Sequence, residues 1–219
     1  MNQIRVKALP EEIVGRIREM IRKGILKEGD KIVEKALCEQ MGVSRTPLRE
    51  ALRLLSAEGL IQLVPNRGAR VAQPSLNDIG EMFQVMSILE GACARQCAEK
   101  LTEKGLRKLE ELHEKLEKHA KEKDYEKYVL VNHRYHTLVQ ELAGNKILSE
   151  VINGLRQKIL LHRYRQILMP NRLEQSMQEH RDLQEAFRTK EPEAAERLMK
   201  HHLIRQCETL ERATSKVAS

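Results

Sequence analysis

The sequence predicts a mostly α-helical chain of two domains: three short helices with a β-hairpin, then an all-α antiparallel bundle of about six helices. Three observations lead to this fold class. Apolar residues recur at helical spacing through most of the 219 residues. A strand pattern is confined to residues 60–71, and Gln73-Pro74-Ser75 interrupts the chain. We therefore expect one domain over residues 1–74 and a second over residues 75–219.

Two helices are expected before residue 42. Ile13, Ile17 and Ile21 form the apolar stripe of the first helix. A shorter helix is expected over roughly residues 33–41, around Ala36 and Leu37.

The third helix is the most informative element, because its start and both of its faces can be assigned. Gly42 permits a tight turn, Thr46 is expected as the N-cap, and Pro47 suits the first helical position. A stripe of Leu and Ala at helical spacing should be buried, which directs a second stripe outward. The outward stripe consists of Arg45, Arg49 and Arg53.

A hairpin follows this helix. The apolar residues Leu60, Ile61, Leu63 and Val64 precede the turn Pro65-Asn66-Arg67-Gly68, and residues 69–71 follow it. Three helices and a hairpin make a winged helix-turn-helix, whose third helix enters the DNA major groove. Arginine there can reach a guanine edge, while hydroxyls hold phosphates. Ser44, Arg45, Thr46 and Arg49 fit these roles. The alternatives are a solvated surface helix and a hairpin without a partner.

The charge distribution agrees with a DNA-binding module. Residues 1–74 carry 14 Lys and Arg against 9 Asp and Glu, a balance of +5. The remainder carries 25 against 23, a balance of +2, and the two sum to the net charge of +7. Excess positive charge in the first domain is expected of a protein that neutralises phosphates.

Residues 9–72 resemble the DNA-binding domain of the GntR family of bacterial transcription regulators. The resemblance rests on the turn from Gly24 to Asp30, on Glu34 to Cys38, and on the run from Val43 to Leu60. It implies base contacts from Arg45 and Arg49 and phosphate contacts from Ser44, Thr46 and the wing residues Arg67 and Gly68. Glu28 and Cys38 depart from the usual proline and alanine, away from the DNA face.

The second domain should consist of helices, because almost no strand alternation occurs after Leu76. Thr102, Asp124, Gly144-Asn145, Pro170 and Pro192 mark the breaks between helices. The expected helices cover residues 76–100, 103–122, 124–143, 146–168, 171–188 and 192–213.

Three histidines fall within apolar helical stripes of this domain: His136, His180 and His202. Asn132 lies one helical turn before His136. A hydrogen-bonded core histidine is the simpler interpretation of each one taken alone. Three imidazoles from different helices, however, suit a divalent transition metal: zinc, nickel, manganese or iron.

Residues 76–213 are similar to the FadR-type C-terminal domain, an effector-binding bundle of this regulator family. The similarity rests on Asn132 to His136 followed by Ala143 to Asn145, on Glu179 to Leu183, and on His202-Leu203. It implies that Asn132, His136, His180 and His202 are the metal ligands. The remaining histidines lie outside the motif: His113, His119, His133, His162 and His201.

Two departures from the family pattern concern the bound ligand. Asn132 stands where many relatives have aspartate, which predicts weaker metal retention and a stronger demand for an anionic ligand. Met86 stands where relatives usually place an arginine that faces the effector. Its absence removes a bidentate partner for a carboxylate.

The sequence thus predicts a dimeric, metabolite-responsive transcription regulator, in most cases of this family a repressor, that binds an inverted-repeat operator. The effector is expected to be a small organic acid, and the residues that contact it are not identified. A metal sensor and a metal-dependent enzyme are the rival interpretations, but no catalytic motif accompanies the histidines, and we expect no enzyme activity.

Two further expectations concern the location of the protein in the cell and the role of its cysteines. No apolar run spans a bilayer and no signal peptide is evident, so a cytoplasmic protein is expected, without a membrane partner. Cys93 and Cys97 share one helical face, which leaves a redox sensor open beside buried structural thiols.

Overall fold

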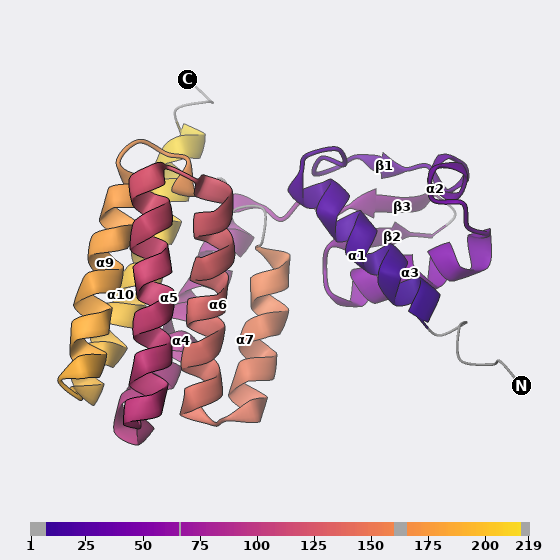
Figure 1. Cartoon of the computed structure of the whole chain (residues 1–219). Helices are drawn as coiled ribbons and strands as arrows, with labels where there is room; N and C mark the ends of the chain where they lie inside the picture. The colour runs from indigo at the N-terminus through magenta and orange to yellow at the C-terminus, as the bar shows by residue number, and fades with distance from the viewer. Residues whose placement is uncertain (1–7, 66, 160–165, 216–219) are drawn as a thin grey trace, which may run out of the picture. The chain divides into compact units, whose positions relative to one another are not determined.

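The computed structural model describes residues 8–65, 67–159 and 166–215 (Figure 1). The chain divides into two compact units, residues 1–75 and residues 76–219. The first unit carries helices and a small sheet, and the second consists of helices in its described part, as the predicted fold class requires.

The first unit contains three helices and three strands. In chain order they are α1 (Ala8–Arg22), β1 (Lys31–Ile32), α2 (Glu34–Met41), α3 (Arg45–Ala57), β2 (Ile61–Val64) and β3 (Gly68–Val71). The apolar stripes predicted for α1 and α3 are buried against each other, with Ile17, Leu48 and Leu55 fully enclosed. The predicted hairpin is β2 and β3, paired antiparallel.

The sheet has one strand that the sequence analysis missed. Its order is β1-β3-β2, and β1 pairs antiparallel with β3, placing Ile32 opposite Ala69. A two-residue strand is too short to display a period of two, so only the tertiary pairing reveals it.

The turn between α2 and α3 corrects the predicted start of the third helix. Gly42 adopts φ 68°, a left-handed conformation that glycine adopts without strain. The N-cap is Ser44, not Thr46, with extended angles of φ −80° and ψ 167°. Pro47 therefore lies third in the helix, where its missing N–H is still one of the first-turn groups without a helical partner.

The second unit is a bundle of long helices. They are α4 (Leu76–Lys100), α5 (Glu103–Glu122), α6 (Tyr125–Ala143), α7 (Lys146–Lys158), α9 (Arg172–Arg188) and α10 (Pro192–Ser215). Thr102, Asp124 and Asn145 cap three of these helices by accepting a backbone N–H. The helix predicted over 146–168 was too long: α7 ends at Lys158, and residues 160–165, including His162, lie outside the described residues.

Helices α6 and α9 run in the same direction with a constant offset. Tyr128 donates a hydrogen bond to Ser176 and Tyr135 donates one to Gln184, both at 2.9 Å, across 48 and 49 positions of sequence. This register brings residues about 48 positions apart to the same level, and Asn132 and His180 form such a pair. No helix in the described part of the chain is long and apolar enough to cross a membrane.

Candidate functional site

The outward face of α3 carries exposed arginines at the N-terminal end of the helix. Arg45, Arg49 and Arg53 are all exposed, and so are Ser44 and Thr46. The side chain of Arg49 is 62% exposed, and its Nε donates to Glu34 Oε2 at 2.9 Å. The helix thus presents hydroxyls and guanidinium groups to solvent while Leu48, Leu52 and Leu55 are buried on its other side.

The wing supplies Arg67 and Gly68, both exposed, at the turn between β2 and β3. The backbone N–H of Arg67 donates to Val64 O at 3.0 Å, and Gly68 adopts φ 86°. A residue with a Cβ would be strained at Gly68, so glycine keeps this turn tight.

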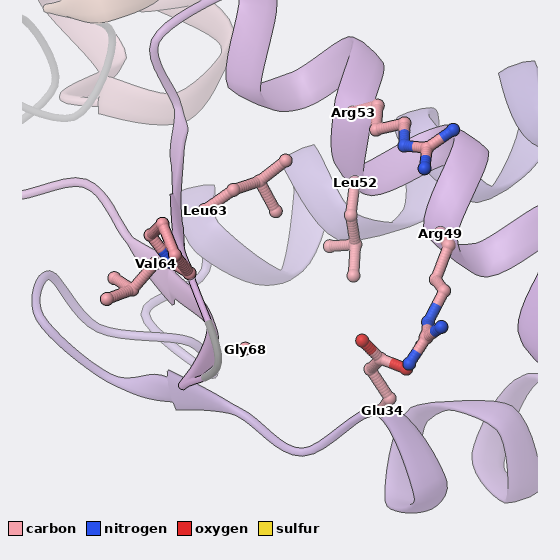
Figure 2. A pocket seen from close by; sticks show the side chains of 8 residues that line it. Glu34, Arg49, Leu52, Arg53, Leu63, Val64 and Gly68 are labelled. Atoms are coloured by element: carbon pink, nitrogen blue, oxygen red, sulfur yellow. The ribbon is translucent and has the colours of Figure 1, made fainter.

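A hollow of about 520 Å³ lies between α3, the wing and the start of α2. Figure 2 shows Arg49 and Glu34 pointing toward one another there, with Leu52 and Leu63 also on the wall. Its lining therefore includes two of the predicted DNA-contacting residues, Arg49 and Gly68. Glu34 was not predicted as part of this surface, because its closeness to Arg49 depends on how α2 packs on α3.

Three imidazoles converge in the second unit. His136 of α6, His180 of α9 and His202 of α10 each place a ring nitrogen within 4.8 Å of the others, and each is at most 2% exposed. Their ring centroids are 4.9 to 5.5 Å apart. Asn132 joins them, because its Oδ1 lies 2.7 Å from His180 Nε2. The structure thus brings together the four residues that the sequence pattern singled out.

Two ion pairs flank these imidazoles: the pair of Glu90 with Arg156 is buried, and the pair of Glu179 with Arg172 is partly buried. The Glu179 carboxylate accepts hydrogen bonds from both terminal nitrogens of Arg172, at 2.8 and 2.9 Å. It also accepts one from His202 Nδ1 at 2.6 Å. Glu90 is held by two nitrogens of Arg156, and its Oε2 lies 2.9 Å from His136 Nδ1.

The sequence analysis did not assign these four charged residues. Charged residues at core-facing positions of the predicted helices could have indicated them. Glu90, Arg156 and Arg172 are indeed at most 3% exposed.

His136 Nδ1 faces the Glu90 carboxylate. His136 Nε2 and His180 Nδ1 lack a hydrogen-bond partner among the described residues. Buried polar atoms without partners are uncommon, and a bound ion or water is one of their ordinary explanations.

Burial keeps two of the three imidazoles, those of His136 and His180, neutral. It lowers the pKa of His136 to about 3 and that of His180 well below its usual range, since a charged ring would be desolvated. Burial raises the pKa of Glu179, but hydrogen bonds and charge from His202 and Arg172 outweigh it and lower that pKa to about 2. Neutral rings keep a lone pair for a metal, which protonated rings do not.

The donor set fits a divalent transition ion. Three imidazole nitrogens and an amide oxygen would leave further positions open for other ligands. A carboxylate against the Nδ1–H of a ligating histidine fixes its tautomer and directs Nε2 toward the ion, and Glu179 occupies that position for His202.

The structure also shows where the other residues discussed in the sequence analysis lie. Met86 is fully buried in the core. Cys93 and Cys97 are buried free thiols, and burial raises the pKa of each to about 12, so they stay protonated and unreactive. Among the other histidines, His133 and His201 are exposed, and His113 and His119 are half-buried.

Taken together, the first unit is a winged helix-turn-helix and the second a helical bundle with a buried histidine cluster. Residues 9–71 match the family described as bacterial regulatory proteins, gntR family, and residues 81–205 match the FCD domain. The chain therefore belongs to the GntR family of DNA-binding transcription regulators and carries an FCD domain.

Individual relatives agree with this assignment. The chain is 28% identical to the HTH-type transcriptional regulator YdhC of Bacillus subtilis over 91% of its length and 89% of the relative. It is 27% identical to McbR of Escherichia coli, with 85% of each chain covered. The solved structure of E. coli McbR/YncC superposes with a TM-score of 0.80 over 94% of this chain and 98% of that one, at 24% identity. The family and these relatives are transcriptional regulators rather than enzymes.

Proposed function

We propose that this regulator binds an inverted-repeat operator in double-stranded DNA as a homodimer and represses transcription until a small-molecule effector binds. Two relatives support repression by their names: the repressor RspR of E. coli and a probable D-xylose utilization operon repressor of Paenarthrobacter nicotinovorans. A two-fold dimer of winged units would read two half-sites of opposite orientation.

In this proposal Arg45 and Arg49 contact base edges, and Ser44, Thr46, Arg67 and Gly68 contact phosphates. The exposure of all six residues supports these roles. Selection of bound sequences from a randomised DNA pool tests the operator, and sedimentation of the complex tests the dimer. A two-fold symmetric consensus bound by two chains is expected. An asymmetric consensus bound by a single chain would contradict the proposal.

The bundle is proposed to hold one divalent transition metal through His136, His180, His202 and Asn132, with zinc most expected and nickel, manganese or iron as alternatives. The observation that carries this proposal is the convergence of three buried imidazoles, two of which, His136 and His180, are neutral and have a ring nitrogen without a partner among the described residues. When bound, such an ion supplies a Lewis acid that an anionic ligand can complete.

The effector is proposed to be a small organic acid at the open positions of this ion. Asn132 contributes no negative charge, so the positive charge of the ion would favour a carboxylate. The effector would change DNA binding only by its different affinity for the DNA-competent arrangement and the other one. Titrating carboxylates against operator binding by the metal-loaded protein tests this. Operator affinity that no carboxylate changes would contradict it.

A metal sensor is the second candidate function, because the histidine cluster would serve equally well if the ion itself were the signal. One titration distinguishes the metal sensor from the metabolite receptor. Metal added without any carboxylate should change operator affinity for a sensor, whereas a metabolite receptor should respond only when the carboxylate is also present.

A further inference from the structure

His202, on α10, contacts a polar side chain at each of its two ring nitrogens. Its Nδ1 lies 2.6 Å from a carboxylate oxygen of Glu179, and its Nε2 lies 2.7 Å from the amide nitrogen of Gln206. Gln206 follows His202 by four positions on the same helix, so the two side chains share one helical face. Both residues are almost fully buried, with 2% and 1% exposed. The contact between them therefore lies inside the core.

The contact with Glu179 decides which nitrogen of His202 is available to an ion. The ionised carboxylate of Glu179 only accepts hydrogen bonds, so Nδ1 carries a proton. When the ring is neutral, its lone pair is on Nε2, the nitrogen that would coordinate a metal. The Gln206 amide donates its N–H to this same nitrogen. Because the nitrogen has one lone pair, it cannot hold the amide proton and an ion at the same time.

The amide of Gln206 has no other hydrogen bond within the described part of the chain. Its Oε1 is buried without a partner. A buried amide oxygen without a partner costs free energy, and an apolar side chain of the same length would avoid that cost. A glutamine at this position is therefore explained by its contact with the imidazole rather than by packing.

Gln140 shows that spacing alone does not produce such a contact. It follows His136 by four positions on α6 and is also buried, with 2% exposed. Neither of its amide atoms has a partner among the residues that the structure describes, so it makes no hydrogen bond to a ring nitrogen. The contact with His202 is thus specific to Gln206.

We propose that Gln206 competes with the metal ion for His202 Nε2 and so lowers the affinity of the histidine cluster for the ion. This inference rests on the metal site of the proposed function. In the metal-free chain the amide occupies the coordinating nitrogen, and only the fraction of molecules in which the amide has moved away can accept the ion. Asn132 differs, because the amide oxygen that contacts His180 is itself a possible metal ligand, whereas an amide N–H is not.

The same contact stabilises the metal-free bundle. Without it, the lone pair of a buried imidazole nitrogen would lack a partner. Gln206 therefore favours the metal-free state over the metal-bound state by the value of about one buried hydrogen bond. This corresponds to a factor of up to about tenfold in the affinity for the ion.

The first test compares zinc affinities of full-length chains by competition with a chromophoric chelator. Gln206→Met keeps the length of the side chain and removes the competing N–H, so it should bind zinc several-fold tighter than wild type, up to about tenfold. Gln140→Met is the matched control: it makes the same change at the equivalent position of α6 without removing a hydrogen bond to a ring, and it should not gain affinity.

A purely structural role for Gln206 predicts the opposite direction, because a disturbed core would hold the ion less well. Unchanged or weaker zinc binding by Gln206→Met, or an equal gain in both variants, would therefore overturn the proposal. If neither wild type nor Gln206→Met bound zinc, the proposed metal site would be contradicted and this inference with it. Zinc binding by Gln206→Met alone would support the inference in its strongest form.

The second test uses wild type and so does not depend on the folding of a variant. The side-chain N–H signals of Gln206 are followed by NMR while zinc is added to the metal-free protein. Zinc should move them from hydrogen-bonded values toward those of an unbonded glutamine amide. Signals that keep their hydrogen-bonded values while zinc binds would show that the amide stays on His202, which would contradict the proposal.

Discussion

The face of α3 proposed to bind DNA and the histidine cluster of the second unit use polar side chains in opposite ways. On α3 the arginines are exposed, and the ion pair between Arg49 and Glu34 is open to solvent. In the bundle the three clustered histidines are almost fully buried, and the ion pair between Arg156 and Glu90 lies inside the core. Exposed charges can exchange partners with DNA at low cost, whereas buried charges hold one arrangement.

The largest contrast between the two regions is expected when Glu179, in the bundle, is neutralised and the effect is compared with that of neutralising Glu34, beside α3. Glu179→Gln should weaken metal binding about 10- to 100-fold, because the hydrogen-bond acceptor of His202 Nδ1 loses its negative charge and no longer fixes the tautomer as strongly. It should also destabilise the bundle by about 3 kcal/mol, since Arg172 is left buried without an anion. Competition with a chromophoric chelator measures the affinity, and chemical unfolding measures the stability.

Glu174→Gln, an exposed change on the same helix, is the matched control and should alter neither property. Adding Arg172→Met to Glu179→Gln should restore part of the stability but not the metal affinity. Recovery of both would show that Glu179 acts only through the fold.

Arg49→Ala should weaken binding to the selected operator by about 1 to 3 kcal/mol, with a much smaller effect on unrelated DNA, if Arg49 reads a base. Fluorescence anisotropy on both DNAs measures the difference. Arg16→Ala removes the same charge from an exposed position on α1 and should have little effect on discrimination. Equal losses on operator and unrelated DNA would contradict base reading by Arg49.

Acid should destabilise the metal-free bundle. The imidazole of an unfolded histidine takes up a proton near pH 6.5, whereas burial holds the pKa of His136 near about 3 and that of His180 well below normal. The stability from these groups is therefore fully present above about pH 6.5 and is lost as the pH falls toward 3. Tm measured in chelator should fall between pH 7.5 and 5.0, and His136→Phe should reduce that fall. A pH-independent Tm in wild type would be inconsistent with buried neutral rings.

The smallest effect is expected at the exposed ion pair. Glu34→Gln should change the stability of the winged unit by less than about 1 kcal/mol, as is usual for pairs open to water. The measurable change should be a shift of a few-fold in operator affinity, because Arg49 loses a partner that limits its orientations. A stability loss as large as that of Glu179→Gln would remove the contrast between the two regions.

The sequence predicted the first region better because its signals are local. Gly42, the arginine stripe and the hairpin turn lie within about 30 consecutive residues, and each can be recognised from residues that are close together in the sequence. The two-residue β1 and the end of α7 at Lys158 escaped prediction, because neither carries a periodic or capping signal of its own.

The histidine cluster required separate helices to be brought together. Helical periodicity placed His136, His180 and His202 inward, but their meeting depends on the parallel register of α6 and α9. The partners Glu90 and Arg156 are 66 positions apart, a distance over which spacing carries no information. Periodicity therefore indicates which residues are buried, and tertiary packing decides which of them meet.

The most direct test of the central claim is the number of divalent metal ions per chain, measured by mass spectrometry of the intact protein after zinc loading and removal of free ion. The proposal predicts one ion per chain in wild type and none in His180→Ala, with the winged unit still folded. Wild type that retains no more ion than His180→Ala would contradict it.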